Sequence, residues 1–254
     1  MPGLPDVVSV SLRIRRRLGQ VRAARVASWS PWTDRIESTR AVERAAPAAP
    51  VRFMPARAVF MADGYGYQFV EAGRLLVANP LLPDPNFDRT VVLLLAYSEE
   101  GALGVVLNRP SETLLAAPLP RWEELAADPA VVFVGGPVES QAVICLARGA
   151  GPTGSDGASS GWQAVAPGVG IQGLDEDPEG LRPGVTEVRV FAGYAGWMAG
   201  QLENEISMGA WWVVDAEPED PFSDEPGELW KRVLRRQRGP LVLVSAYPAD
   251  PDMN

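Results

Sequence analysis

Histidine is absent from this chain of 254 residues, and cysteine occurs once. Without imidazole there is no Ser-His-Asp or Cys-His nucleophile system, no imidazole acid or base near neutral pH, and no His-ligated metal. One cysteine allows neither an internal disulfide nor a thiolate cluster. Because Cys145 lies in the apolar run AVICLA, we predict a buried strand thiol there rather than an activated nucleophile.

Long apolar runs are lacking too. None reaches the roughly 18 residues that a membrane-spanning helix needs, and the N-terminus has no apolar signal core followed by a small-residue cleavage site. We therefore expect no membrane span and a cytoplasmic location. Hydrophobic residues make up 46% of the chain and charged residues 22%, which suits a globular protein that buries a core.

Charge is distributed unevenly along the sequence. Residues 1 to 60 carry a balance of +7, so the remaining 194 residues must carry −16 to give the total of −9. A core this acidic is poorly suited to hold a phosphate backbone, because such binding depends on Lys and Arg displacing counterions. The core also has no helix-turn-helix, zinc-finger or RNP pattern, so direct DNA binding by it is not expected.

The basic N-terminal segment contains RIRRRLGQVRAAR and ends in the low-complexity stretch AAPAAP. It is typical of a poorly ordered arm and linker. Residues 11 to 26 could form an amphipathic basic helix that contacts nucleic acid or an anionic surface. Alternatively, the native chain begins at Met54 or Met61 and lacks the arm. We predict an arm over residues 1–60 and one α/β domain over residues 61–254.

Apolar runs predict the strands. They cover residues 74–79, 90–97, 187–192, 211–214 and 241–247, with a hairpin from TVVLLLAY into GVVLNRP and a second strand pair formed by VVFVGGPV and QAVICLAR. The Pro-rich segment NPLLPDPNFD can only be an ordered loop. The glycine-rich segment 149–161 predicts a flexible surface insertion without a phosphate-binding sequence.

Three segments predict helices: residues 121–128, 193–208 and 228–236. Strands interleaved with helices indicate a layered α/β domain, and the two hairpins require antiparallel pairing. The expected fold class is therefore α/β with mixed α+β character: a single compact domain with a mixed, twisted β-sheet, hairpins and flanking helices.

Four segments in order resemble the AlgH/YqgE family of bacterial proteins: ANPLLPDPNFDRTVVLL, GALGVVLNRPSE, VFVGGPV and GYAGWMAGQLENEI. The resemblance spans about residues 70 to 254 and leaves the N-terminal 60 outside. It implies a mixed α/β sheet and a role as a transcriptional regulator, linked in some bacteria to alginate production. It attaches no reaction to the chain.

The segment GYAGWMAGQLENEI suggests a bare helical face. Gly193, Gly196, Gly200 and Asn204 recur at spacings of three, four and four, which a helix would place on one side. Such a stripe admits either the sheet or a ligand. On the same helix Gln201 and Glu205 would share another face, and Glu203 would point elsewhere, so we expect solvated or Arg-bound carboxylates rather than an acid/base pair.

Two strand ends form the second half of the candidate site. Asn108 and Arg109 end one strand, and Gly135 and Gly136 end another, where α/β folds offer free amides and an Arg for an anion. A tight turn with an Arg–carboxylate pair is the structural alternative. The residues predicted to bind a ligand are Asn108, Arg109, Gly135, Gly136, Gly193, Gly196, Trp197, Gly200, Gln201 and Glu203.

Neither a metal nor a cofactor is expected. The oxygen-rich loop with Asn79, Asp84, Asn86 and Asp88 matches no EF-hand spacing, and Asx residues among prolines more often cap turns. We predict no catalytic residue.

Three hypotheses for function stay open. The first is a non-enzymatic regulatory or interaction protein with an unknown protein partner. The second is a small-ligand binder or enzyme that uses carboxylates and Arg109 in a cleft without a signature cofactor. The third is a regulator that touches nucleic acid through the Arg-rich arm alone.

Overall fold

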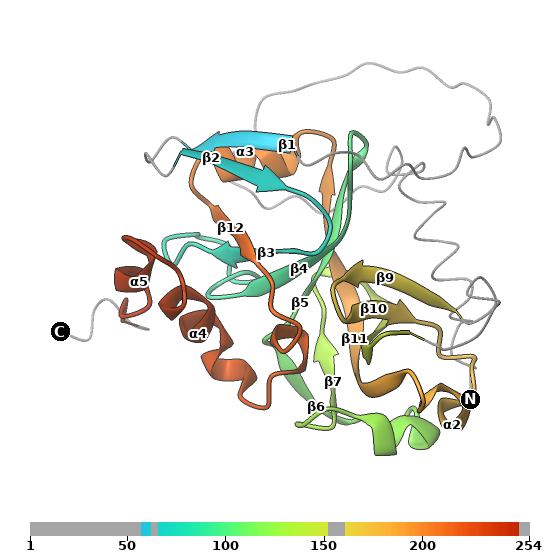
Figure 1. Ribbon diagram of the computed structural model, residues 1–254. Coiled ribbons are helices and arrows are strands. Elements are labelled where there is room, and N and C mark those ends of the chain that lie inside the picture. Colours follow the sequence, from blue (N-terminus) through green and yellow to red (C-terminus); the bar gives the residue numbers. More distant parts are fainter. Residues whose placement is uncertain (1–56, 62–65, 152–160, 249–254) are drawn as a thin grey trace.

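The structure is a computed structural model that describes residues 57–61, 66–151 and 161–248 (Figure 1). The expectations for the arm and for most of the segment 149–161 therefore lie outside the described residues. A two-stranded ribbon is formed by β1 (Arg57–Met61) and β2 (Gly66–Val70). The described part then forms one ten-stranded sheet. Its strands are β3 (Arg74–Ala78), β4 (Val91–Ser98), β5 (Gly101–Val106), β6 (Pro110–Leu114), β7 (Val131–Val134), β8 (Val138–Gly149), β9 (Trp162–Ala166), β10 (Val169–Gln172), β11 (Val185–Met198) and β12 (Trp211–Asp215).

Helices are few and short. The α-helices are α2 (Pro178–Leu181), α3 (Gln201–Ser207), α4 (Leu229–Arg235) and α5 (Leu241–Val244), and the 3₁₀ turns are η1 (Pro120–Leu125), η2 (Asp220–Phe222) and η3 (Pro226–Glu228). In Figure 1, α4 and α5 lie together beside β3, whereas α3 lies with the β1–β2 ribbon at the opposite end. Within the described ranges, no helix is long and apolar enough to cross a membrane.

The sheet is mixed, as predicted. Its main path runs β12-β3-β4-β5-β11-β8-β10-β9, and all pairs on it are antiparallel. The branch β6-β7 joins the path at β11, where β7 runs parallel to β11. The hairpin of β4 and β5 is confirmed, with Ser98 opposite Gly101.

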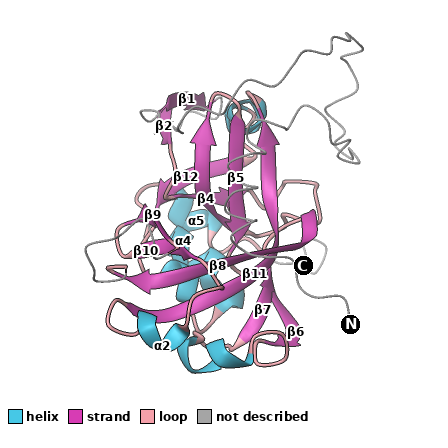
Figure 2. Cartoon of the chain, turned by 90° about the vertical axis from the view of Figure 1, so that its right-hand side faces the viewer, coloured by secondary structure: helices cyan, strands magenta, loops and turns pink. Residues whose placement is uncertain are grey.

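Strand β11 holds the two halves of the sheet together. Its residues 185–194 pair with β8, and its residues 195–198 pair with β5 (Figure 2). The register with β8 shifts between Ala192 and Tyr194, and such bulges bend a strand. One strand thereby spans a curled sheet.

The helix expected over residues 193–208 is wrong for its first half. The strand β11 continues to Met198, and only Gln201–Ser207 are helical. Side chains alternate along the strand, with Ala195 and Trp197 buried and Met198 exposed. This two-residue period is that of a strand, so the glycine stripe on one helical face does not exist.

Two other expectations need correction. Residues 241–247 contain the short helix α5 rather than a strand; Pro240 stands before it, a position where proline suits a helix start, and short apolar runs do not separate the two types. The strands β7 and β8 do not pair with each other, because β11 lies between them.

The core fills both faces of the central strands. Leu75 to Ala78 and Val91 to Leu94 are fully buried, as expected for continuous apolar strands covered on both sides. On one side α4 contributes Trp230, whose Nε1 donates to the Ala78 carbonyl at 2.9 Å. Cys145 is fully buried in β8, as predicted, and burial raises the pKa of its thiol, which keeps it protonated.

Candidate functional site

Asn108 and Arg109 support the Pro-rich loop that precedes β4. The Asn108 Oδ1 accepts a hydrogen bond from the Val91 amide at 3.0 Å, and its Nδ2 donates to the Arg89 carbonyl at 2.8 Å. Arg109 Nη2 donates to the Asp88 carbonyl at 2.9 Å. Arg89 has a positive φ of 47°, uncommon outside glycine, and the two side chains hold it there. Arg109 therefore bonds carbonyls rather than the carboxylate that the structural alternative expected.

The loop's own Asx residues cap turns. Asn79 Oδ1 accepts from the Leu81 amide at 2.9 Å, and Asp84 Oδ1 accepts from the Asn86 amide at 2.9 Å. Both are Asx turns. Among the described residues, no group of three or more His, Cys, Asp or Glu could hold a metal ion.

Gly135, Gly136 and Gly193 lie where the β7–β8 connection crosses β11. The Gly135 amide donates to Ala192 at 2.8 Å, and its carbonyl accepts from Val106 at 2.8 Å. A Cβ on Gly193 would stand 2.6 Å from the Gly136 carbonyl oxygen, and Gly193 has a φ of 75°. Side chains at this crossing would collide with backbone, so all three glycines serve close packing.

These strand ends do come together, although through backbone atoms. The Val134 amide donates to the Arg109 carbonyl at 2.8 Å, which places the turn at Arg109 beside the end of β7. The Arg109 side chain, however, is directed to the loop before β4. The Arg109 guanidinium is therefore not available to a ligand at Gly135 and Gly136 in this arrangement. The ligand-binding role of these three residues stays a prediction.

The remaining predicted residues lie at the end of β11 and the start of α3. Gly196 pairs with Leu103, and Gly200 precedes α3 with a left-handed φ of 75°. Trp197 is buried. Glu203 accepts a hydrogen bond from the Tyr97 hydroxyl at 2.8 Å.

Glu205 is the centre of a partly buried polar cluster in this region. Its Oε2 accepts from the indole Nε1 of Trp197 at 2.9 Å and from that of Trp211 at 2.8 Å. Its Oε1 accepts from Gln201 Nε2 at 2.9 Å, as the four-residue spacing suggested. The two indoles meet edge to face at 5.9 Å between ring centroids. The Glu205 carboxylate thus binds indoles rather than the solvent or arginine that we expected.

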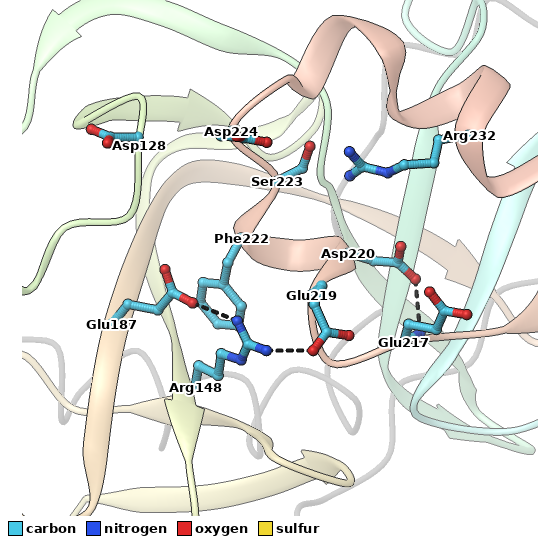
Figure 3. Close-up of a pocket in the computed structure, with 10 residues that line it drawn as sticks. All are labelled: Asp128, Arg148, Glu187, Glu217, Glu219, Asp220, Phe222, Ser223, Asp224 and Arg232. Atoms are coloured by element: carbon cyan, nitrogen blue, oxygen red, sulfur yellow. Dashed lines mark hydrogen bonds and ion pairs between the residues drawn. The ribbon is translucent and has the colours of Figure 1, made fainter.

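A charged cleft lies elsewhere on the molecule, with a volume of about 530 Å³ (Figure 3). Its walls come from β8, β11, the connection before β7, the segment after β12, and α4. It is lined by six carboxylates, two guanidinium groups, Phe222 and Ser223; the charged residues are Asp128, Arg148, Glu187, Glu217, Glu219, Asp220, Asp224 and Arg232. None of the predicted ligand-binding residues is among them.

Two arginines fix the geometry of the cleft. Arg148 joins Glu187 at 2.9 Å and also pairs with Glu219 (Figure 3). Arg236 grips the buried Asp220 through both nitrogens, at 2.7 and 2.6 Å, and contacts Glu217 at 3.1 Å. Burial lowers the pKa of Arg236, but the hydrogen bond and ion pair with Asp220 outweigh burial and leave its pKa above the ordinary value.

A third guanidinium lies beneath the cleft. Arg189 is 2% exposed, and its Nη atoms donate to the carbonyls of Pro221, Ser223 and Asp128. Its Cζ stands 4.3 Å from the centre of the Phe133 ring. Burial lowers the pKa of Arg189 to about 10, and the nearby carboxylates oppose that shift, so the group stays charged at neutral pH.

Four carboxylates remain open to solvent around the cleft: Asp128, Glu217, Glu219 and Asp224. Asp128 and Asp224, together with Glu187, partly balance the buried Arg189. Glu217 and Glu219 keep 59% and 60% of their side-chain surface exposed, and each gives only one oxygen to an arginine. Six carboxylates thus meet four guanidinium groups, those of Arg148, Arg189, Arg232 and Arg236, which leaves the cleft a surplus of two negative charges.

Sequence reasoning missed this cleft. The one available signal was the acidic run DAEPEDPFSDEPGE after β12, which supplies Glu217, Glu219, Asp220 and Asp224. The opposite wall comes from residues that lie 28 to 96 positions earlier, counted from Asp215 to Glu187 and from Asp224 to Asp128. Only the fold brings them together.

Known proteins resemble this chain over the described region. A family model described as AlgH-like matches residues 75–242. A UPF0301 protein from Streptomyces coelicolor is 51% identical over 182 residues, which are 72% of this chain and 94% of that one. A UPF0301 protein from Mycobacterium marinum is 46% identical over 190 residues, which are 74% and 92% of the two chains.

The fold agrees as well. The crystal structure of a protein from Corynebacterium diphtheriae is similar with a TM-score of 0.63 and 32% identity, covering 69% of this chain and 92% of that one. The family model spans well over half of the chain and runs from Leu75 in β3 past the end of α4. This chain therefore belongs to the AlgH-like family.

Proposed function

We propose that this chain is a non-enzymatic interaction protein that binds a positively charged segment of a protein partner in its acidic cleft. The observation that carries the proposal is the surplus of exposed carboxylate at Glu217 and Glu219, on the rim of a concave site.

The charge of the whole molecule favours the same ligand. With −16 on residues 61–254, the field around the domain attracts cations, and the excess of carboxylates over guanidinium groups in the cleft has the same sign. Arginine and lysine side chains meet carboxylates with charge-assisted hydrogen bonds. A regulatory role, which the family resemblance implies, would then be exercised on a protein rather than on DNA.

Ion pairs with arginine fix the positions of the cleft's carboxylates. Arg148 pairs with Glu187 and Glu219, and Arg236 pairs with Asp220 and Glu217, so each arginine holds two carboxylates in place and balances the charge of one. Preorganised charges lose less entropy when a ligand arrives.

The alternative of an enzyme or small-ligand binder built on Arg109 has less support, because the Arg109 side chain bonds the loop before β4 and lies outside the cleft. A substrate turned over by the purified chain would favour this alternative.

Fluorescence anisotropy with a labelled hexa-arginine peptide tests the proposal. We expect the full-length chain to bind the peptide, and we expect its affinity for the peptide to fall steeply with added salt. The double variant Glu217→Gln, Glu219→Gln should bind about tenfold more weakly than its parent, the sum of two exposed ion pairs, when both chains also carry Arg15→Gln, Arg16→Gln, Arg17→Gln, which weakens the chain's own arginine-rich stretch as a competitor. The matched variant Glu71→Gln, Glu112→Gln removes two exposed carboxylates elsewhere. Equal loss in both variants would refute the cleft as the binding site.

A further inference from the structure

We infer that the cleft is occupied, in the resting chain, by the arginine-rich segment of its own N-terminal arm, residues 11–26. This inference rests on the proposed function, since it names a segment that competes for the same site. It assigns the arm a regulatory role: an outside partner must displace it.

Charge complementarity selects this segment. Residues 11–26 contain six arginines and no acidic residue: Arg13, Arg15, Arg16, Arg17, Arg22 and Arg25. The following residues, 27–50, balance Arg35, Arg40 and Arg44 against Asp34, Glu37 and Glu43. The positive charge of residues 1–50 is therefore concentrated in residues 11–26.

The carboxylates that remain available match that stretch. Asp128, Asp224 and Glu187 stabilise the charge of Arg189 below the cleft. Glu217 and Glu219 each pair with an arginine through one oxygen and keep 59% and 60% of their side-chain surface exposed. Guanidinium groups fit such sites as well as ammonium groups and hold their charge at every physiological pH.

The tether is long enough. About 30 residues separate Arg25 from the first strand at Arg57, and an extended chain of that length reaches about 100 Å. A domain of this size is roughly 45 Å across, judged from a radius of gyration of about 16 Å. A tethered segment also meets the cleft at an effective concentration near the millimolar range, so several ion pairs that together give a dissociation constant below that range keep it bound.

The arm lies outside the region that this chain shares with its relatives. The 182 matched residues make up 94% of the Streptomyces relative but only 72% of this chain, and the matched family region begins at residue 75. That relative has little room for a counterpart of the arm.

Paramagnetic relaxation in the full-length chain tests the inference. A nitroxide is attached at Gln20→Cys; Cys145 is fully buried and stays unlabelled. We expect the amide signals of the non-proline residues among 217–224 to lose at least about half of their intensity at low salt. They should recover in about 0.5 M salt, where the Debye length falls to roughly 4 Å. Even broadening over the whole surface, or broadening centred elsewhere, would overturn the inference.

Two matched pairs of variants sharpen the result. The broadening should vanish in Arg15→Gln, Arg16→Gln, Arg17→Gln and persist in Arg35→Gln, Arg40→Gln, Arg44→Gln, which removes the same charge from the balanced part of the arm. It should also vanish in Glu217→Gln, Glu219→Gln and persist in Glu71→Gln, Glu112→Gln. Loss with the control member of either pair would contradict a specific contact.

Mixing identifies whose cleft is filled. Isotope-labelled chains without nitroxide, mixed with unlabelled chains that carry it, should show no broadening at residues 217–224. Broadening in the mixture would mean that the arm occupies a second copy and would overturn self-docking.

Peptide binding separates this inference from the proposed function. Hexa-arginine should bind Arg15→Gln, Arg16→Gln, Arg17→Gln about tenfold more tightly than the native chain, because the competitor is weakened. Equal binding that still depends on Glu217 and Glu219 would overturn self-docking and leave the proposed function standing. Failure of every chain to bind the peptide would instead overturn the proposed function.

Discussion

Asn108 uses both ends of its carboxamide to fix a loop residue in an unfavourable conformation. Its carboxamide bonds the Arg89 carbonyl and the Val91 amide. Arg89 is the residue with the positive φ, and Val91 begins the strand that follows it. From the sequence this asparagine could be placed at a strand end, but its partners 17 and 19 positions earlier could not be identified.

Asn108→Ala should therefore lower the free energy of unfolding by about 2 kcal/mol, because two partly buried backbone groups lose their partners. Asn86→Ala removes the same side chain from an exposed turn of the same loop and should cost less than about 0.5 kcal/mol. Urea titrations of both variants measure the difference. Similar losses would show that the Asn108 bonds contribute nothing special.

Glu205 carries a second residue-scale prediction. Glu205→Ala would leave the buried indole groups of Trp197 and Trp211 without an acceptor, at a cost of about 3 kcal/mol. Glu203→Ala, two positions away on α3, removes an equal carboxylate that serves Tyr97 and should cost about 1 kcal/mol. Chemical denaturation followed by tryptophan fluorescence would reveal the order, and a larger loss at Glu203 would contradict it.

At the scale of elements, β11 decides the architecture, and it is also where reading the sequence failed. The spacing of Gly193, Gly196 and Gly200 fits a helix, yet Ala195 and Trp197 point inward with a strand's alternation. The segment therefore fits both the helical period of 3.6 residues and the strand period of two residues. The segment becomes a strand because β11 pairs with β5, β7 and β8. These tertiary contacts outweigh the local preference of the sequence.

The core strands were predictable for the opposite reason. Leu75 to Ala78 and Val91 to Leu94 are apolar without interruption, and only a strand covered on both faces accommodates such runs at that length. The weakly patterned strands β6, β9 and β10 gave no comparable signal.

The glycine crossing between β7, β8 and β11 gives a prediction at this scale. Gly193→Ala would place a Cβ 2.6 Å from the Gly136 carbonyl oxygen at a positive φ and should destabilise the fold by about 3 kcal/mol or more. Gly227→Ala, where a Cβ meets nothing within 4 Å, should change stability by less than about 1 kcal/mol. Thermal unfolding compares them; an equal effect would mean that the crossing tolerates a shift.

At the scale of the whole molecule, the self-docking inferred above would bring the basic and acidic parts of the sequence together. The sequence alone showed a basic segment and an acidic remainder, but it could not show that six of the carboxylates line one cleft, because Asp128, Glu187 and Glu219 come from separate strands and loops. None of the candidate residues that the motifs suggested lines the cleft, and their ligand-binding role stays a prediction.

Charge reversal in the cleft tests the central claim most directly. In the full-length chain, Glu217→Lys with Glu219→Lys should abolish hexa-arginine binding and create binding of a hexa-glutamate peptide, because the rim then carries the opposite sign. The control, Glu71→Lys with Glu112→Lys, makes the same change in net charge and should keep the native preference for arginine within about threefold. If the cleft reversal left the affinity for hexa-arginine equal to that of the control, the cleft would not be the binding site and the account would fail.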